Sequence, residues 1–172
     1  MGRSAHADRI SAPSKKGGRY FFHRNDGLQD QSVFYTTKDL KRKPKVLFDP
    51  NKLSGDGTVA LKDISISHNG KYMAYSLSAS GSDWVEWKVR DIDTGKDLSD
   101  HLKWSKFSDA TWSGDNKGFY YGRFPTPKKG EEMMAANTDK KIYYHKLGTA
   151  QSEDTLVYER PDHPKWGLYT GL

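Results

Sequence analysis

The chain has 172 residues, of which 34% are hydrophobic and 13% aromatic, and its net charge is +6. This length is enough for one domain with its own core, and the aromatic content is too high for a disordered chain. The absence of cysteine excludes disulfides and thiolate chemistry, and no run of about 18 apolar residues is present to cross a membrane as a helix.

The first twelve residues, 1–12, are polar and lack the apolar segment of a signal peptide, so we expect a disordered leader there. From residue 13 onward, aromatic clusters such as Tyr20–Phe22 and Tyr143–Tyr144 alternate with turn residues. Short aromatic runs between turns are typical of β-strands. The sequence therefore predicts an all-β domain over residues 13–172.

The same ten-residue pattern occurs at Ile66–Tyr75 and at Trp112–Tyr121, with an offset of 46 residues. Each copy contains an apolar residue, a serine, a polar turn, a lysine and then an apolar strand that ends in tyrosine. A third copy starts at Gly18, which is 52 residues before Gly70. Beyond residues 125–139 the offset becomes 55, so this Pro- and Lys-rich segment is predicted to be a loop insertion.

One repeat unit contains four predicted strands, at residues 63–67, 72–77, 85–91 and 98–103. Four antiparallel strands in a unit of about 50 residues are the pattern of a β-propeller blade. The predicted fold is a partial β-propeller of about three four-stranded blades with the start of a fourth. The blades are expected at residues 19–50, 59–103 and 106–160, and the fourth is expected to start at 164–172.

Few residues indicate chemistry. The six histidines lack the spacing of a helical metal site, so we expect no metal ion and no cofactor. The serine-rich segment 76–83 is interpreted as a turn, because no base lies nearby to activate a nucleophile. Basic pairs such as Lys128–Lys129 and Lys140–Lys141 fall in predicted loops or strand ends and are interpreted as solvated charges. Nucleic-acid binding, the alternative raised by the net charge, lacks an accompanying motif.

Several segments resemble sequences of prolyl oligopeptidases, and they occur in the same order. These segments are Asp26–Val33, Leu47–Asn51, Leu77–Trp84, Tyr143–His145, Leu147–Thr149, Gln151–Asp154 and Pro164–Trp166. The resemblance covers residues 13–172 and is most specific in Ser78–Trp84. The matched part is similar to the first three propeller blades of that family and the start of the fourth.

The resemblance implies a two-domain serine endopeptidase that cleaves short peptides after proline. Its α/β-hydrolase domain would carry the catalytic triad, and its propeller would cap and gate the active site. This sequence has no Gly-x-Ser-x-Gly nucleophile elbow, so no catalytic residue is assigned and no activity is expected from the chain alone.

The expected partners are proline-containing peptides, bound through the hydrolase domain, and further copies of the chain, through open blade edges. We expect neither nucleic acid nor a membrane as partner. The expected compartment is the cytoplasm, with the periplasm as the alternative for the full-length parent.

Members of the family line the substrate pocket with an aromatic residue at the inner edge of a blade. The stretch Lys106-Phe107-Ser108 matches that position, so Phe107 is the predicted substrate-binding residue. A core aromatic between blades is the alternative interpretation of Phe107. The methionine that some members carry after Pro-Lys-Trp is Gly167 here, which changes that wall of the pocket. A free-standing interaction module remains the alternative function, because propellers also serve as scaffolds.

Overall fold

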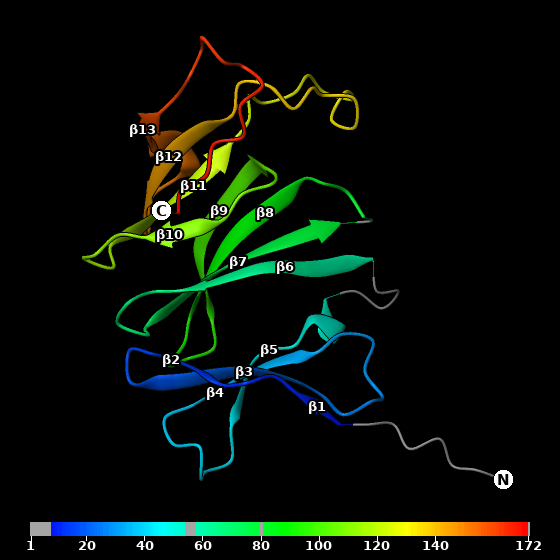
Figure 1. Cartoon of the computed structure of the whole chain (residues 1–172), viewed down its shortest axis with the longest axis vertical. Helices are drawn as coiled ribbons and strands as arrows, with labels where there is room; N and C mark the ends of the chain where they lie inside the picture. Colours follow the sequence, from blue (N-terminus) through cyan, green and yellow to red (C-terminus); the bar gives the residue numbers. More distant parts are fainter. Residues whose placement is uncertain (1–7, 54–57, 80, 172) are drawn as a thin grey trace, which may run out of the picture.

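The computed structural model describes residues 8–53, 58–79 and 81–171. These residues form three antiparallel sheets that stand side by side along the long axis of the molecule (Figure 1). Neighbouring propeller blades have this arrangement, so the predicted all-β partial propeller is confirmed. Residues 1–7 of the expected leader, together with Ser80 and Leu172 of the matched segments, lie outside the described residues.

The first sheet starts earlier than the sequence indicated. Its strands are β1 (Arg9–Ile10), β2 (Ser14–Lys16), β3 (Arg19–Asn25), β4 (Val33–Thr37) and β5 (Lys45–Phe48). β1 and β2 pair with opposite halves of β3, so together they take the place of one edge strand. The sheet therefore begins at Arg9, before the expected blade boundary and inside the segment expected to be disordered. Side chains on β1 and β2 are exposed, and backbone pairing needs no apolar pattern, so their composition carried no strand signal.

The second and third sheets are simple four-stranded meanders. The second contains β6 (Val59–Ile66), β7 (Tyr72–Ala79), β8 (Val85–Asp91) and β9 (Asp97–Ser105). The third contains β10 (Ala110–Trp112), β11 (Gly118–Arg123), β12 (Lys141–Lys146) and β13 (Thr155–Tyr158). The four strands predicted for the second unit are confirmed, and the predicted insertion 125–139 lies between β11 and β12.

The remaining structure is short. The helices η1 (Pro50–Lys52) and η2 (Gln151–Glu153) are single 3-10 turns. Residues 164–171, where a fourth blade was expected to start, form turns and bends and contain no strand. In the described ranges no helix has the length and apolar character needed to cross a membrane.

Two apolar clusters join the three sheets. The first lies between the first and second sheets and comprises Phe21, Phe34, Leu47, Phe48, Met73, Tyr75 and Ile92. The second lies between the second and third sheets and comprises Ala74, Val85, Trp87, Val89, Leu102, Ala110, Trp112, Phe119 and Tyr121. Alternation along β7 sends Met73 and Tyr75 to the first cluster and Ala74 to the second, so the middle sheet is covered on both faces.

The sheets approach each other closely at one end. A Cβ on Gly17 would lie 2.2 Å from the backbone carbon of Asn69, and Gly17 has a φ of +57°. Only glycine accepts both conditions without strain. The Asn69-Gly70 hairpin predicted from the sequence is confirmed, with Gly70 at φ +69°.

Strand direction alternates within a meander, so the connections after β7, β9 and β11 all emerge at the opposite end of the sheets. We call this end, formed by residues 81–84, 106–109 and 124–140, the loop end. It contains Phe107, the residue that the family resemblance indicated.

Candidate functional site

The connection between β9 and β10 presents Phe107 at the loop end. Phe107 is 49% exposed, although its neighbours Lys106 and Ser108 are buried. The backbone of Phe107 has a φ of +50°, a left-handed conformation that is rare for a bulky residue. Such a conformation costs about 1–3 kcal/mol and persists only where the surroundings hold it.

Hydrogen bonds to the backbone and to the serine side chains in and beside this connection provide that hold. The Nζ of Lys140 donates to the carbonyl oxygen of Phe107 at 2.5 Å. The backbone N–H of Gly122 donates to Ser108 Oγ at 2.8 Å, and Ser105 Oγ donates to the carbonyl oxygen of Gly122 at 2.6 Å. The start of β12 and the end of β11 therefore fix the connection from one side.

The C-terminal segment fixes it from another side. The carboxylate of Asp109 accepts hydrogen bonds from the Thr170 hydroxyl at 2.7 Å and from the backbone N–H groups of Thr170 and Gly171 at 3.2 Å each. Burial alone would raise the pKa of Asp109, but these donors bring it below its ordinary value. An ionised Asp109 thus fixes the C-terminal segment against the β9–β10 connection, two residues after Phe107.

Lys106 anchors the connection through its side chain. Its ammonium nitrogen lies 3.8 Å from the ring centroid of Trp84 and 5.4 Å from that of Phe124. Trp84 is itself held, because its indole N–H donates to the carbonyl oxygen of Glu132 at 2.7 Å. Burial lowers the pKa of Lys106, against the opposing charge of Asp83. A cation packed on aromatic faces is stabilised by their quadrupoles.

A hollow of about 250 Å³ lies beside the exposed ring of Phe107. It is lined by Lys62, Asp63, Gly81, Ser82, Asp83, Val85, Phe107 and Ser108. Burial, with a contribution from the charge of Asp109, raises the pKa of Asp63. The ring of Phe107 can pack against an apolar group of a ligand, while the nearby carboxylates can bind hydrogen-bond donors or cations next to that group. Among the described lining residues there is no histidine to activate a serine, so the arrangement is suited to binding.

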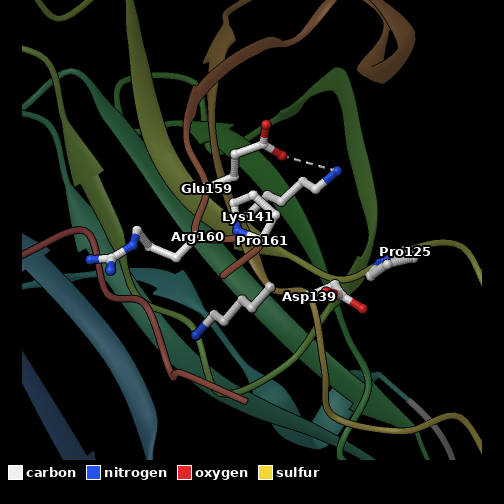
Figure 2. A pocket seen from close by; sticks show the side chains of 7 residues that line it. Pro125, Asp139, Lys141, Glu159, Arg160 and Pro161 are labelled. Atoms are coloured by element: carbon white, nitrogen blue, oxygen red, sulfur yellow. Dashed lines mark ion pairs between the residues drawn. The ribbon is translucent and has the colours of Figure 1, made fainter. Parts of the chain in front are cut away.

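A second hollow, of about 240 Å³, lies next to Lys140 and is shown in Figure 2. Its walls are Pro125, Asp139, Lys140, Lys141, Glu159, Arg160 and Pro161. Lys141 and Glu159 form an ion pair at 3.3 Å across it. Lys140 and Lys141 are adjacent in sequence but differ in role, because Lys141 pairs with a carboxylate and Lys140 reaches the backbone of Phe107.

Phe107 and Gly167, the two residues that the family resemblance indicated, lie in different segments of the chain. The exposed ring of Phe107 does not belong to either core cluster, so the interpretation as a core aromatic is wrong for these three sheets. Gly167 lies in the C-terminal segment, where a Cβ would be 3.6 Å from the ring of Tyr169. The centroid of that ring is 4.5 Å from the ammonium nitrogen of Lys140, which in turn donates to the carbonyl oxygen of Phe107.

Sequence reasoning missed both lysines. Lys140 was interpreted as a solvated charge, but it is 4% exposed, and Lys106 is 5% exposed. The available signal was their position next to aromatic residues or Pro-rich loops, which does not separate a buried lysine from an exposed one. A lysine is normally expected to be exposed, since lysine is among the residues least often buried.

Comparison with known proteins identifies the family. The family model described as the prolyl oligopeptidase N-terminal β-propeller domain matches residues 1–172. The chain belongs to the prolyl oligopeptidase family. It is 42% identical over 158 residues to a prolyl endopeptidase of Elizabethkingia miricola, a match that covers 92% of this chain and 22% of that relative. A prolyl endopeptidase of Elizabethkingia meningoseptica is 43% identical with the same coverage.

Solved structures of the family agree. Prolyl oligopeptidase B from Galerina marginata, bound to a 35mer hydrolysis and macrocyclization substrate, matches with a TM-score of 0.86 and 33% identity. The match covers 96% of this chain and 26% of that structure. The chain therefore spans about a quarter or less of the relatives that it matches, and it corresponds to part of their N-terminal propeller.

Proposed function

We propose that this chain is the propeller part of a serine endopeptidase that cleaves short peptides after proline. In this proposal the propeller caps the hydrolase domain, gates access to its active site and has no peptidase activity alone. The match of the whole chain to the family's propeller model is the observation that carries the proposal. It is supported by the identity to prolyl endopeptidases and by the lack of a nucleophile elbow in this sequence.

Within that function, Phe107 contacts the substrate. The support is geometric: an exposed ring on a strained and anchored backbone is presented to a partner and not to the core. The hollow beside it, with Val85 and Asp83 in its wall, offers an apolar contact next to a negative charge. A prolyl ring flanked by peptide N–H groups has matching chemistry.

Two measurements test the proposal. The purified chain, incubated with a proline-containing chromogenic peptide, is expected to give no turnover above buffer, and clear hydrolysis would overturn it. In the full-length peptidase, Phe107→Ala is expected to raise KM for the same peptide while the protein stays folded. Unchanged kinetics would remove Phe107 from the pocket.

One observation favours a second expectation, self-association. β13 lies at the edge of the third sheet, and its apolar residues Leu156, Val157 and Tyr158 are 43–50% exposed. An exposed apolar edge strand is a template for pairing with another chain. Light scattering after size-exclusion chromatography is expected to show concentration-dependent dimers of the isolated chain. A strict monomer with a cooperative melt would instead favour the free-standing interaction module.

A further inference from the structure

The side chain of Lys140 follows a path that the third sheet leaves open for it. Lys140 precedes β12 and is 4% exposed, and its stem passes directly over Gly122 of β11. A Cβ on Gly122 would lie 2.4 Å from Cε and 3.3 Å from Nζ of Lys140. Gly122 has no side chain, so the stem can cross the sheet and reach the β9–β10 connection.

The ammonium group of Lys140 contacts a carbonyl oxygen and aromatic rings. Its hydrogen bond goes to the carbonyl oxygen of Phe107, and the rings of Tyr169 and Phe124 lie 4.5 and 5.9 Å from the nitrogen. In the described part of the chain Lys140 forms no ion pair, in contrast to Lys141 with Glu159. The ammonium group thus donates to a backbone oxygen and packs near two aromatic rings.

We propose that Lys140 is a positioning residue of the substrate site: its ammonium group holds the carbonyl of Phe107, sets the direction of the exposed ring, and loosens when it loses its proton. The proposal rests on the proposed function, because it takes Phe107 as the substrate contact. It adds a residue and a pH dependence that the family match does not supply.

The physical reason is the strain at Phe107. A left-handed backbone at a bulky residue relaxes unless its surroundings hold it, and the Lys140 bond is one of the restraints on that peptide unit. A hydrogen bond from a charged donor is roughly twice as strong as one from a neutral donor. Loss of the proton therefore weakens the restraint and lets the ring of Phe107 sample other directions.

The relevant proton is lost in an accessible pH range. Burial lowers the pKa of Lys140 to about 8, although the charge of Asp109 raises it. Other charged or titratable groups lie around Lys140. They are Lys106 of the β9–β10 connection, Tyr169 of the C-terminal segment, and Asp139, Lys141, Glu159 and Arg160, which line the hollow in Figure 2. The ammonium form holds Phe107 below this pKa, and the hold weakens as the pH rises above it.

The first test uses the chain itself and needs no catalysis. With ¹³C at the lysine Cε and the phenylalanine carbonyl, a pH titration by NMR is expected to show one common midpoint near the pKa of about 8 for Lys140 Cε and the Phe107 carbonyl. Lys140→Met is expected to shift the Phe107 carbonyl signal and abolish its titration. Lys140→Arg is expected to keep the bonded position without titrating, because a guanidinium does not lose its proton.

Lys141→Met is the matched control, because Lys141 lies next to Lys140 but pairs with Glu159. It is expected to leave the titration of the Phe107 carbonyl unchanged. A Phe107 carbonyl that titrates equally in Lys140→Met and in the unmodified chain would overturn the proposal.

The second test uses the full-length peptidase. Lys140→Met is expected to raise KM for a proline-containing peptide about tenfold at neutral pH, with kcat nearly unchanged, because the loss is one of positioning. In the unmodified enzyme KM is expected to rise between pH 7 and 9, and Lys140→Arg is expected to remove that rise.

The outcomes separate the two proposals. If Phe107→Ala raises KM but Lys140→Met and Lys140→Arg keep the unmodified pH profile, the positioning role of Lys140 is wrong. If Phe107→Ala leaves KM unchanged, the substrate contact is wrong, and with it the link between Lys140 and peptide binding. The carbonyl titration of the isolated chain then still decides whether Lys140 holds Phe107.

Discussion

Neighbouring sheets meet at two interfaces, which we call the lower seam (first and second sheets) and the upper seam (second and third sheets). Polar side chains are arranged in the same way in both seams but differ in their chemistry. In the lower seam, between the first and second sheets, the Tyr75 hydroxyl donates to Asp97 at 2.7 Å, and Arg90 donates both to Asp97 and to the carbonyl oxygen of Leu47. Each of these residues belongs to the second sheet except Leu47, which belongs to β5. A tyrosine, an aspartate and a cation therefore connect the second sheet to the outer strand of the first.

The upper seam repeats this arrangement one blade later. Tyr121, 46 residues after Tyr75, donates to Asp154 at 2.5 Å. His145, 55 residues after Arg90, lies 2.6 Å from Asp154 and 2.6 Å from Asp100 on β9 of the preceding sheet. The cation again reaches the outer strand of the neighbouring blade, but it meets a carboxylate there in place of a carbonyl.

This difference changes the electrostatics of the seam. The side chains of Arg90 and Asp97 are 20% and 36% exposed, whereas His145, Asp100 and Asp154 have no exposed side-chain surface. Burial alone would lower the pKa of His145, but the two carboxylates raise it to about 9. The equivalent position thus holds a partly solvated ion pair in the lower seam and a buried, titratable network in the upper seam. A repeat preserves the geometry of a contact more strictly than its chemistry.

Removing the buried cation is expected to have the largest effect. His145→Leu leaves Asp100 and Asp154 facing each other without a positive charge, which is expected to cost about 3–5 kcal/mol of unfolding free energy in urea. His101→Leu is the control, since His101 meets Glu86 at 3.1 Å but is 40% exposed. A loss for His145→Leu no larger than for His101→Leu would show that the buried network does not stabilise the upper seam.

A change of pH is expected to distinguish the upper seam from the lower one. A histidine whose pKa rises on folding stabilises the folded chain fully below its unfolded pKa of about 6.5, and this contribution is lost as the pH rises towards 9. Relative to His145→Gln, the unfolding free energy of the unmodified chain is expected to fall by about 1.5 kcal/mol between pH 6.5 and 8. Parallel curves for the two proteins would contradict a charged His145.

Removing the cation of the lower seam is expected to cost less. Arg90→Met keeps apolar contact with Phe48 and Tyr75 but loses the bonds to Asp97 and to the carbonyl of Leu47. Because water reaches this pair, the expected loss is about 1 kcal/mol. The measurement is the urea midpoint at pH 7, and a loss equal to that of His145→Leu would erase the distinction between the seams.

The surface pair at the rim of the lower seam is expected to matter least. Arg19 pairs with Asp93 of the β8–β9 turn and lowers the pKa of that carboxyl. Asp93 is solvated, so Arg19→Met is expected to shift the urea midpoint less than Arg90→Met does. About 1 M salt is expected to remove the shift, because its screening length is close to 3 Å. A shift that persists in salt would indicate a packing role for the Arg19 stem.

The loop end separates what sequence reasoning could reach from what it could not. The family resemblance singled out Phe107, which is exposed in the structure, and its contact with substrate stays a prediction. Lys140 was not found, because nothing in its neighbourhood along the chain reports that Gly122 and the Phe107 carbonyl lie beside it. The early start of the first sheet was also missed, since β1 and β2 depend on backbone pairing with β3 and not on an apolar pattern.

Sequence patterns were sufficient to predict the strands of the repeat unit, the repeat itself and the family. These follow from local features: alternating aromatic and apolar residues, turn residues such as Asn69-Gly70, and a motif order that needs no knowledge of packing. Only the tertiary structure decided which charged residues are buried and with what they pair. Asp100 and His145 are 45 residues apart, and Phe107 and Lys140 are 33 apart, so their contacts depend on how the sheets stack. Desolvation and charge pairing are set by that stacking, which is why the pKa values of His145 and Lys140 move in opposite directions.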